Sequence, residues 1–102
     1  MPTFLMIARH SPENCPMNSE KAKKMAIELM GHIGDLTKKH GVKIVGGWTA
    51  MTEHLLIYVF EGTHQGFEKF TMEPAIMKVV ATQDSCEIKM VMTLEESMKL
   101  LK

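Results

Sequence analysis

The segment HLLIYVF, residues 54–60, has the clearest β-strand character in this chain, because four of its seven residues are β-branched or aromatic. Three other apolar runs of strand length flank it along the chain: residues 3–10, 42–51 and 85–92. Apolar residues at three- and four-residue spacing over residues 22–36 predict an amphipathic helix after the first run. A second helix, which contains Phe67 and Phe70, follows the third run. The predicted order is therefore strand, helix, strand, strand, helix, strand.

Residues typical of helix ends support these boundaries. Asn18 or Ser19 is expected to cap the first helix, and Gly41 suits the left-handed conformation that often ends a helix. Thr63 is expected to cap the second helix. Pro74 interrupts that helix, after which a short helical piece restarts.

Two more local signals complete the prediction of elements. Gly46 and Gly47, inside the second strand, predict a β-bulge or a close approach of the backbone. Thr93 and Glu96 have the spacing of a capping box, which predicts a terminal helix that runs through Leu101.

This order of elements predicts one α+β domain over residues 1–102 with the split βαβ, or ferredoxin-like, topology. Its antiparallel sheet has the strand order 4-1-3-2, and its helices cover one face. The strands are nevertheless apolar on both faces; in the first, Phe4, Met6 and Ala8 alternate with Leu5 and Ile7. A bare second face would expose on the order of 400 Å² of apolar surface, which is large for a monomer. We therefore expect a homodimer joined through the sheet faces.

The chain resembles the dimeric α/β-barrel superfamily, which includes antibiotic-biosynthesis-type monooxygenases and muconolactone isomerases. The resemblance rests on the element order and on three segments: Val45-Gly-Gly-Trp48, the hairpin into His54–Phe60, and Gly66–Phe70 followed by Glu73-Pro74. It is nearest to small member families without an assigned activity, and no catalytic signature transfers residue by residue. The resemblance implies a homodimer whose sheets enclose a small-molecule cavity, and it implies no particular reaction.

The composition argues against several classes of partner. Lys plus Arg and Asp plus Glu both number 12, so the formal net charge is zero, and no basic run exceeds two residues. A nucleic-acid partner is therefore not expected, although the RNA recognition motif shares this topology. No apolar stretch is long enough to span a bilayer, and residues 1–7 lack the basic start of a signal peptide. We expect a cytoplasmic protein with no membrane partner, whose two cysteines are free thiols.

Four residues with metal-ligand chemistry are expected at one end of the sheet: His10, Cys15, His54 and Cys86. His10 ends the first strand, and His54 and Cys86 begin the third and fourth strands, which run in the opposite direction. Cys15 lies in the loop after the first strand. Imidazole and thiolate donors suit zinc or copper, so the sequence predicts a transition-metal site. The alternative is that these are strand-end histidines with ordinary hydrogen bonds and small buried cysteines.

A catalytic interpretation competes with the metal site. His54, as a general base, and Tyr58 could act on a small apolar or aromatic substrate, with Trp48 and Arg9 binding it. The same residues also fit plain packing and, for Arg9, a surface ion pair. His32, His40 and His64 lie on or next to helices and are expected to be solvated. The sequence thus predicts a small-ligand- or metal-binding homodimer, or alternatively a cofactor-independent monooxygenase or isomerase.

Overall fold

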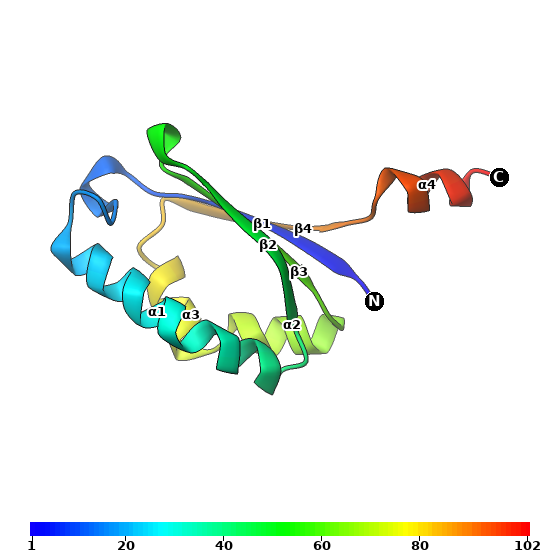
Figure 1. The fold of residues 1–102 in the computed structure, drawn as a ribbon, viewed down its shortest axis with the longest axis horizontal. Coiled ribbons are helices and arrows are strands. Elements are labelled where there is room, and N and C mark those ends of the chain that lie inside the picture. The colour runs from blue at the N-terminus through cyan, green and yellow to red at the C-terminus, as the bar shows by residue number, and fades with distance from the viewer.

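A computed structural model describes all 102 residues as a four-stranded antiparallel sheet with three helices packed on one face and a fourth that extends beyond it (Figure 1). The strands are β1 (Thr3–Arg9), β2 (Lys43–Ala50), β3 (Leu55–Glu61) and β4 (Ser85–Val91). Their order is β2-β3-β1-β4. This is the predicted order read from the other edge, so the α+β class and the sheet topology are confirmed.

The helices are α1 (Glu20–Lys39), α2 (His64–Thr71), α3 (Pro74–Val80) and α4 (Leu94–Leu100). Two short 3₁₀ turns, Pro12–Asn14 and Met51–Glu53, complete the chain. None of the helices is both long and apolar enough to cross a membrane.

The predicted helix caps are confirmed. Of the two candidates for the first cap it is Ser19 whose side chain accepts a hydrogen bond from the backbone of Ala22, and Thr63 caps α2 in the same way. Thr93 and Glu96 form the full capping box of α4. Gly41 has the left-handed φ of 66°. Since each of these signals acts within one helical turn, they could be recognised without knowledge of the tertiary structure.

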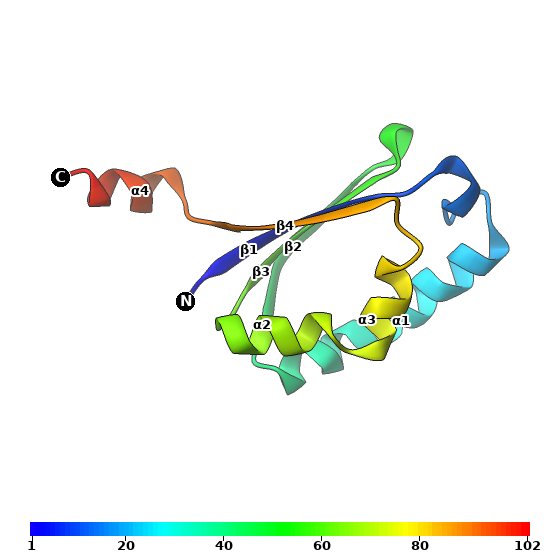
Figure 2. The ribbon, with the colours of Figure 1, turned by 180° about the vertical axis from the view of Figure 1, so that it is seen from behind.

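The core lies between the sheet and the helices and is built mainly from aromatic side chains. Phe4 of β1 stacks on Phe67 of α2 with ring centroids 4.3 Å apart, and Phe60 of β3 contacts both Phe67 and Phe70. These contacts concentrate the core at the end of the sheet that α2 covers. At the opposite end, α1 diverges from the sheet (Figure 2).

The other face of the sheet carries no helix. Cross-strand pairing of Leu5 with Val59 and of Ile7 with Ile57 places these four residues there, where all four are only half-buried. Trp48 pairs with Ile57 and so lies on the same face, with 57% of its surface exposed. We call this surface, made of Leu5, Ile7, Trp48, Ile57 and Val59, the open face. The doubly apolar strands predicted from sequence are therefore present.

The predicted bulge in β2 is also present, as a register shift between Ile44 and Gly46. The indole of Trp48 folds back over Gly46, where a Cβ would come within 2.6 Å of the ring. Only glycine leaves room for this close approach.

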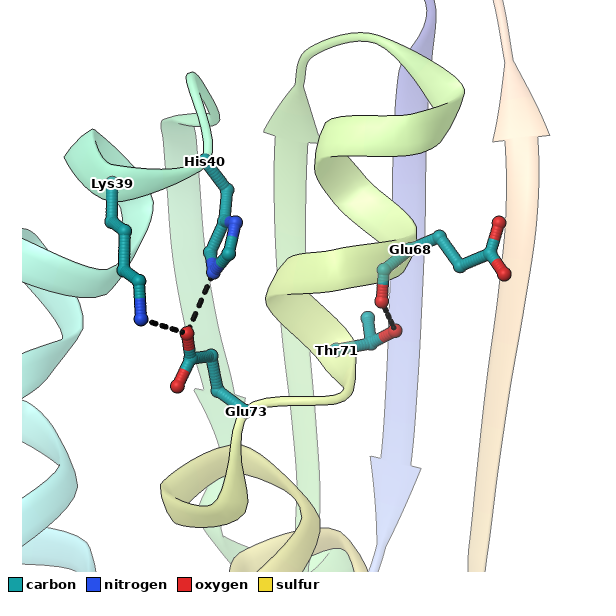
Figure 3. Close-up of polar contacts among 5 residues, drawn as sticks. All are labelled: Lys39, His40, Glu68, Thr71 and Glu73. Carbon is teal, nitrogen blue, oxygen red and sulfur yellow. Dashed lines mark hydrogen bonds and ion pairs between the residues drawn. The ribbon is translucent and has the colours of Figure 1, made fainter.

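Lys39 and His40, at the end of α1, are tied to Glu73, at the start of α3 (Figure 3). Glu73 Oε1 accepts a hydrogen bond of 2.7 Å from His40 Nε2 and one of 2.9 Å from Lys39 Nζ. The sequence predicted that His40 is solvated. This prediction is wrong, because only 13% of its side chain is exposed. The hydrogen bond from His40, followed by that from Lys39, holds the pKa of Glu73 below its ordinary value of 4.5.

This tie should make stability depend on pH. Because the folded-state pKa of Glu73 is lowered, its contribution is present above pH 4.5 and is lost as the pH falls through the lowered value. We expect Glu73→Gln to lower the urea midpoint at pH 7 and to have less effect at pH 3. Glu68→Gln is the control, since the Glu68 carboxylate (Figure 3) belongs to none of the ion pairs of the chain. Equal losses for Glu73→Gln at both pH values would show that the charge of Glu73 does not contribute.

Candidate metal centre

Three of the four predicted ligands converge at one end of the sheet. His10, Cys15 and His54 each offer one donor atom, and these atoms all lie within 4.8 Å of one another. His10 directly follows β1 and His54 directly precedes β3. Because these strands are antiparallel neighbours, with Arg9 opposite Leu55, the two histidines meet at the strand ends. The backbone N–H of His10 donates to the carbonyl of His54 at 3.1 Å, which extends the ladder to the site.

The backbone at His54 is strained. Its φ of 53° and ψ of 45° are left-handed, and it is the only non-glycine residue in the chain with a positive φ. This conformation ends the 3₁₀ turn Met51–Glu53 and brings the imidazole toward His10, with ring centroids 5.4 Å apart and planes at 68°. A left-handed residue of this type costs about 1–2 kcal/mol, and such strain is often found at functional sites.

The loop after β1 holds Cys15 in place. The carbonyl of Cys15 accepts hydrogen bonds from the backbone N–H groups of Asn18, at 2.8 Å, and Ser19, at 2.9 Å. The side-chain amide of Asn18 donates to the carbonyl of Pro12 at 2.9 Å and closes the loop. Cys15 itself is buried, with 6% of its surface exposed. The thiol therefore sits in a preorganised position next to the histidines.

Both histidines contain a ring nitrogen that lacks a partner. His10 Nε2 and His54 Nδ1 are fully buried, and neither makes a hydrogen bond. A buried polar atom left in this state costs about 1–3 kcal/mol. Most buried nitrogens of this kind are paired, so two in one cluster need an explanation. A bound metal ion is one kind of partner that such nitrogens accept.

The spacing of the donors is close to that of a metal site. An ion at the centre of a triangle with sides of 4.8 Å, the upper limit here, would lie about 2.8 Å from each donor. Zinc bonds to nitrogen and sulfur are about 2.0–2.3 Å long, so each donor needs to move inward by roughly half an ångström or slightly more.

Cys86 lies outside this cluster, although it was predicted as a fourth ligand. It pairs with Ala8, which is two residues before His10 in β1, so it is set back along the sheet. Burial raises the pKa of the Cys86 thiol, which lowers the share of thiolate available to bind a metal. Arg9, predicted to bind a substrate, is exposed and does not border the apolar cavity that His10, Cys15 and His54 line.

An apolar cavity of about 610 Å³ lies where α1 diverges from the sheet, and all three donors line it. The resemblance implied a cavity between two sheets, but this one lies between α1 and the sheet of a single chain. Its α1 wall consists of Met30 and of five residues that the sequence pattern marked only as a core face: Ala22, Met25, Ala26, Leu29 and Ile33. Helical periodicity identifies such a face but cannot tell whether the face touches the sheet.

Tyr58 and Trp48, predicted for a substrate site, both border the cavity. The hydroxyl of Tyr58 donates to Met30 Sδ at 3.6 Å, and burial raises the pKa of this phenol. Tyr58 is therefore a hydrogen-bond donor at neutral pH. Trp48 lies at the sheet edge, with its ring over Gly46 on the open face.

No protein-family model matches this chain, and no curated protein is significantly similar to it. The geometry of the site is therefore what indicates the function of the protein.

Proposed function

We propose that this protein binds a transition-metal ion, zinc or copper, through His10, Cys15 and His54. The observation that carries the proposal is the convergence of two imidazoles and one thiol within 4.8 Å. Nitrogen and sulfur donors of this kind suit Zn²⁺ and copper far better than Mg²⁺ or Ca²⁺. The partnerless buried nitrogens of His10 and His54 support it, because ordinary packing would leave both unsatisfied.

Elemental analysis of protein purified without a histidine tag tests the proposal. We expect about one zinc or copper ion per chain, or uptake of one Co²⁺ with the near-ultraviolet absorption of a cobalt–thiolate bond. Cys15→Ser should abolish that absorption, whereas the matched variant Cys86→Ser should retain it. A protein that takes up none of these ions would contradict the proposal.

We also propose that the protein is a homodimer with the ferredoxin-like barrel arrangement. The open face supports this, and so does α4, which extends away from the body of the chain (Figures 1 and 2). Leu94, the first residue of α4, and Leu101, which directly follows the helix, are 85% and 77% exposed. The radius of gyration is 14.7 Å, whereas about 13 Å is typical of a compact chain of this length. A second copy is the simplest partner for apolar surface that this chain leaves uncovered.

The terminal helix gives a test of the dimer. Light scattering should give about twice the 11.5 kDa mass of one chain. The double variant Leu94→Ser, Leu101→Ser should raise the dimer dissociation constant at least tenfold, because two large apolar side chains lose their burial, about 1.5–3 kcal/mol each when complete. The matched control is Glu95→Gln, Lys99→Gln on the same helix. An unchanged dissociation constant in the leucine variant would mean that α4 does not join the copies.

One observation favours a second function, that of a cofactor-independent monooxygenase or isomerase. His54 and Tyr58 both line an apolar cavity of a size suited to small substrates. In this case His54 would be the general base and Tyr58 a hydrogen-bond donor. Activity that persists after removal of all metal would favour this alternative.

A further inference from the structure

We infer that the ion binds a small apolar monoanion in the cavity next to it, as an external fourth ligand. This inference rests on the proposed metal site and specifies the class of molecule that the site takes. Zinc is almost always bound by four donors, and sites with only three protein ligands use the fourth position for water or substrate. Here the protein supplies three, because Cys86 lies outside the cluster.

The fourth position faces the cavity. His10, Cys15 and His54 come from the strand ends and the loop between β1 and α1, and all three line the same space. A volume of about 610 Å³ falls within the roughly 300–1,000 Å³ of small-molecule sites. A molecule that coordinates the ion would therefore extend between α1 and the sheet.

The residues that line the cavity indicate that most of the bound molecule is apolar. Sixteen of the 24 lining residues are hydrophobic, and no Asp, Glu, Lys or Arg is among them. Methionine contributes four of them, at positions 17, 25, 30 and 51, and its flexible thioether adapts to ligands of varied shape. No carboxylate, ammonium or guanidinium group lines the cavity, so a charged group on the ligand finds an opposite charge only at the metal itself.

The net charge of the metal centre indicates which chemical group of the bound molecule contacts the ion. A divalent ion, one thiolate and two neutral imidazoles carry a net charge of +1. No acidic side chain lines the cavity, so none neutralises that charge from the cavity side. Uncompensated charge in an apolar site is costly, so a single negative donor such as a carboxylate, phenolate or thiolate is favoured.

Titration of the Co²⁺-loaded protein with four compounds tests the inference. We expect octanoate to shift the visible cobalt bands with one molecule bound per chain, and to bind at least tenfold tighter than acetate. Octanol should bind more weakly than octanoate, and octylammonium should leave the bands unchanged. Equal affinities for octanoate and acetate, or unchanged bands at high octanoate, would overturn the inference while the metal proposal stands. Failure to bind Co²⁺ at all would overturn both.

A variant of the cavity wall provides a second readout. Ala26 lines the cavity from α1, so Ala26→Trp should fill part of the space and weaken octanoate binding at least tenfold without loss of the cobalt–thiolate absorption. Lys24→Phe, at an exposed position of the same helix, is the matched control. Octanoate affinity unaffected by Ala26→Trp would place the anion elsewhere. The comparison of octanoate with acetate needs no variant, so the inference stays testable if Ala26→Trp fails to fold.

Discussion

His54→Asn will lower the affinity for Zn²⁺ by about 100-fold or more while the protein stays folded. The substitution removes one of three donors, and loss of even an indirect contact to a metal typically costs about 10- to 100-fold. Asparagine is chosen because it tolerates the left-handed backbone of His54 better than alanine does. Competition against a chromogenic chelator, with circular dichroism to confirm folding, measures the effect.

His64→Asn is the matched control for this experiment. His64 is the first residue of α2, is exposed, and packs edge-on against Phe4 with ring centroids 5.5 Å apart. It does not belong to the donor cluster. The zinc affinity of the His64→Asn variant should equal that of the wild type. If both variants bind zinc equally well, the ion is held elsewhere and the proposed centre is wrong.

Ile57→Lys will convert the proposed dimer into a folded monomer, with a rise of at least 100-fold in the dissociation constant. Ile57 lies in the middle of β3 on the open face, opposite Ile7. In a dimer joined through this face, a lysine here would be an unpaired charge away from water, which costs several kcal/mol, and each 1.4 kcal/mol is a factor of ten. Light scattering over a dilution series measures the change.

The neighbouring residue provides the contrast. Leu56 pairs with Ala8 on the helix side and lines the cavity, so Leu56→Lys should lower the free energy of unfolding of the chain itself. Lysine at these two adjacent positions should therefore have different effects: at Ile57 it should dissociate the proposed dimer, and at Leu56 it should destabilise the fold. The reason is that successive side chains of a strand point to opposite faces of the sheet. A soluble dimer of unchanged affinity in Ile57→Lys would show that the open face is not the interface.

Much of the fold could be predicted because its signals are local. Ser19, Thr63 and Thr93 cap helices through contacts within three residues, and Gly41 supplies a backbone conformation that other residues avoid. Alternation along β1 correctly separated Phe4, Met6 and Ala8 from Leu5 and Ile7, which lie on opposite faces of the sheet. The meeting of His10 with His54 also followed from sequence, because sheet order and strand direction alone bring those two strand ends together.

The rest of the site could not be predicted, because a hydrophobic pattern gives no distances between side chains on different elements. Cys15 and Cys86 were both candidates from sequence, but the loop hydrogen bonds bring Cys15 to the histidines, whereas pairing with Ala8 holds Cys86 back. The left-handed backbone of His54 was not foreseen, because it arises from the closure of a turn between two paired strands.

The sequence by itself determined the elements, their order in the sheet and the apolar character of both sheet faces. Only the tertiary structure decided that α1 diverges from the sheet and leaves an apolar cavity beside the donors. The physical reason is that a hydrophobic pattern records which side chains avoid water. The distance between α1 and the sheet depends instead on how the aromatic side chains of the core pack at the other end of the sheet.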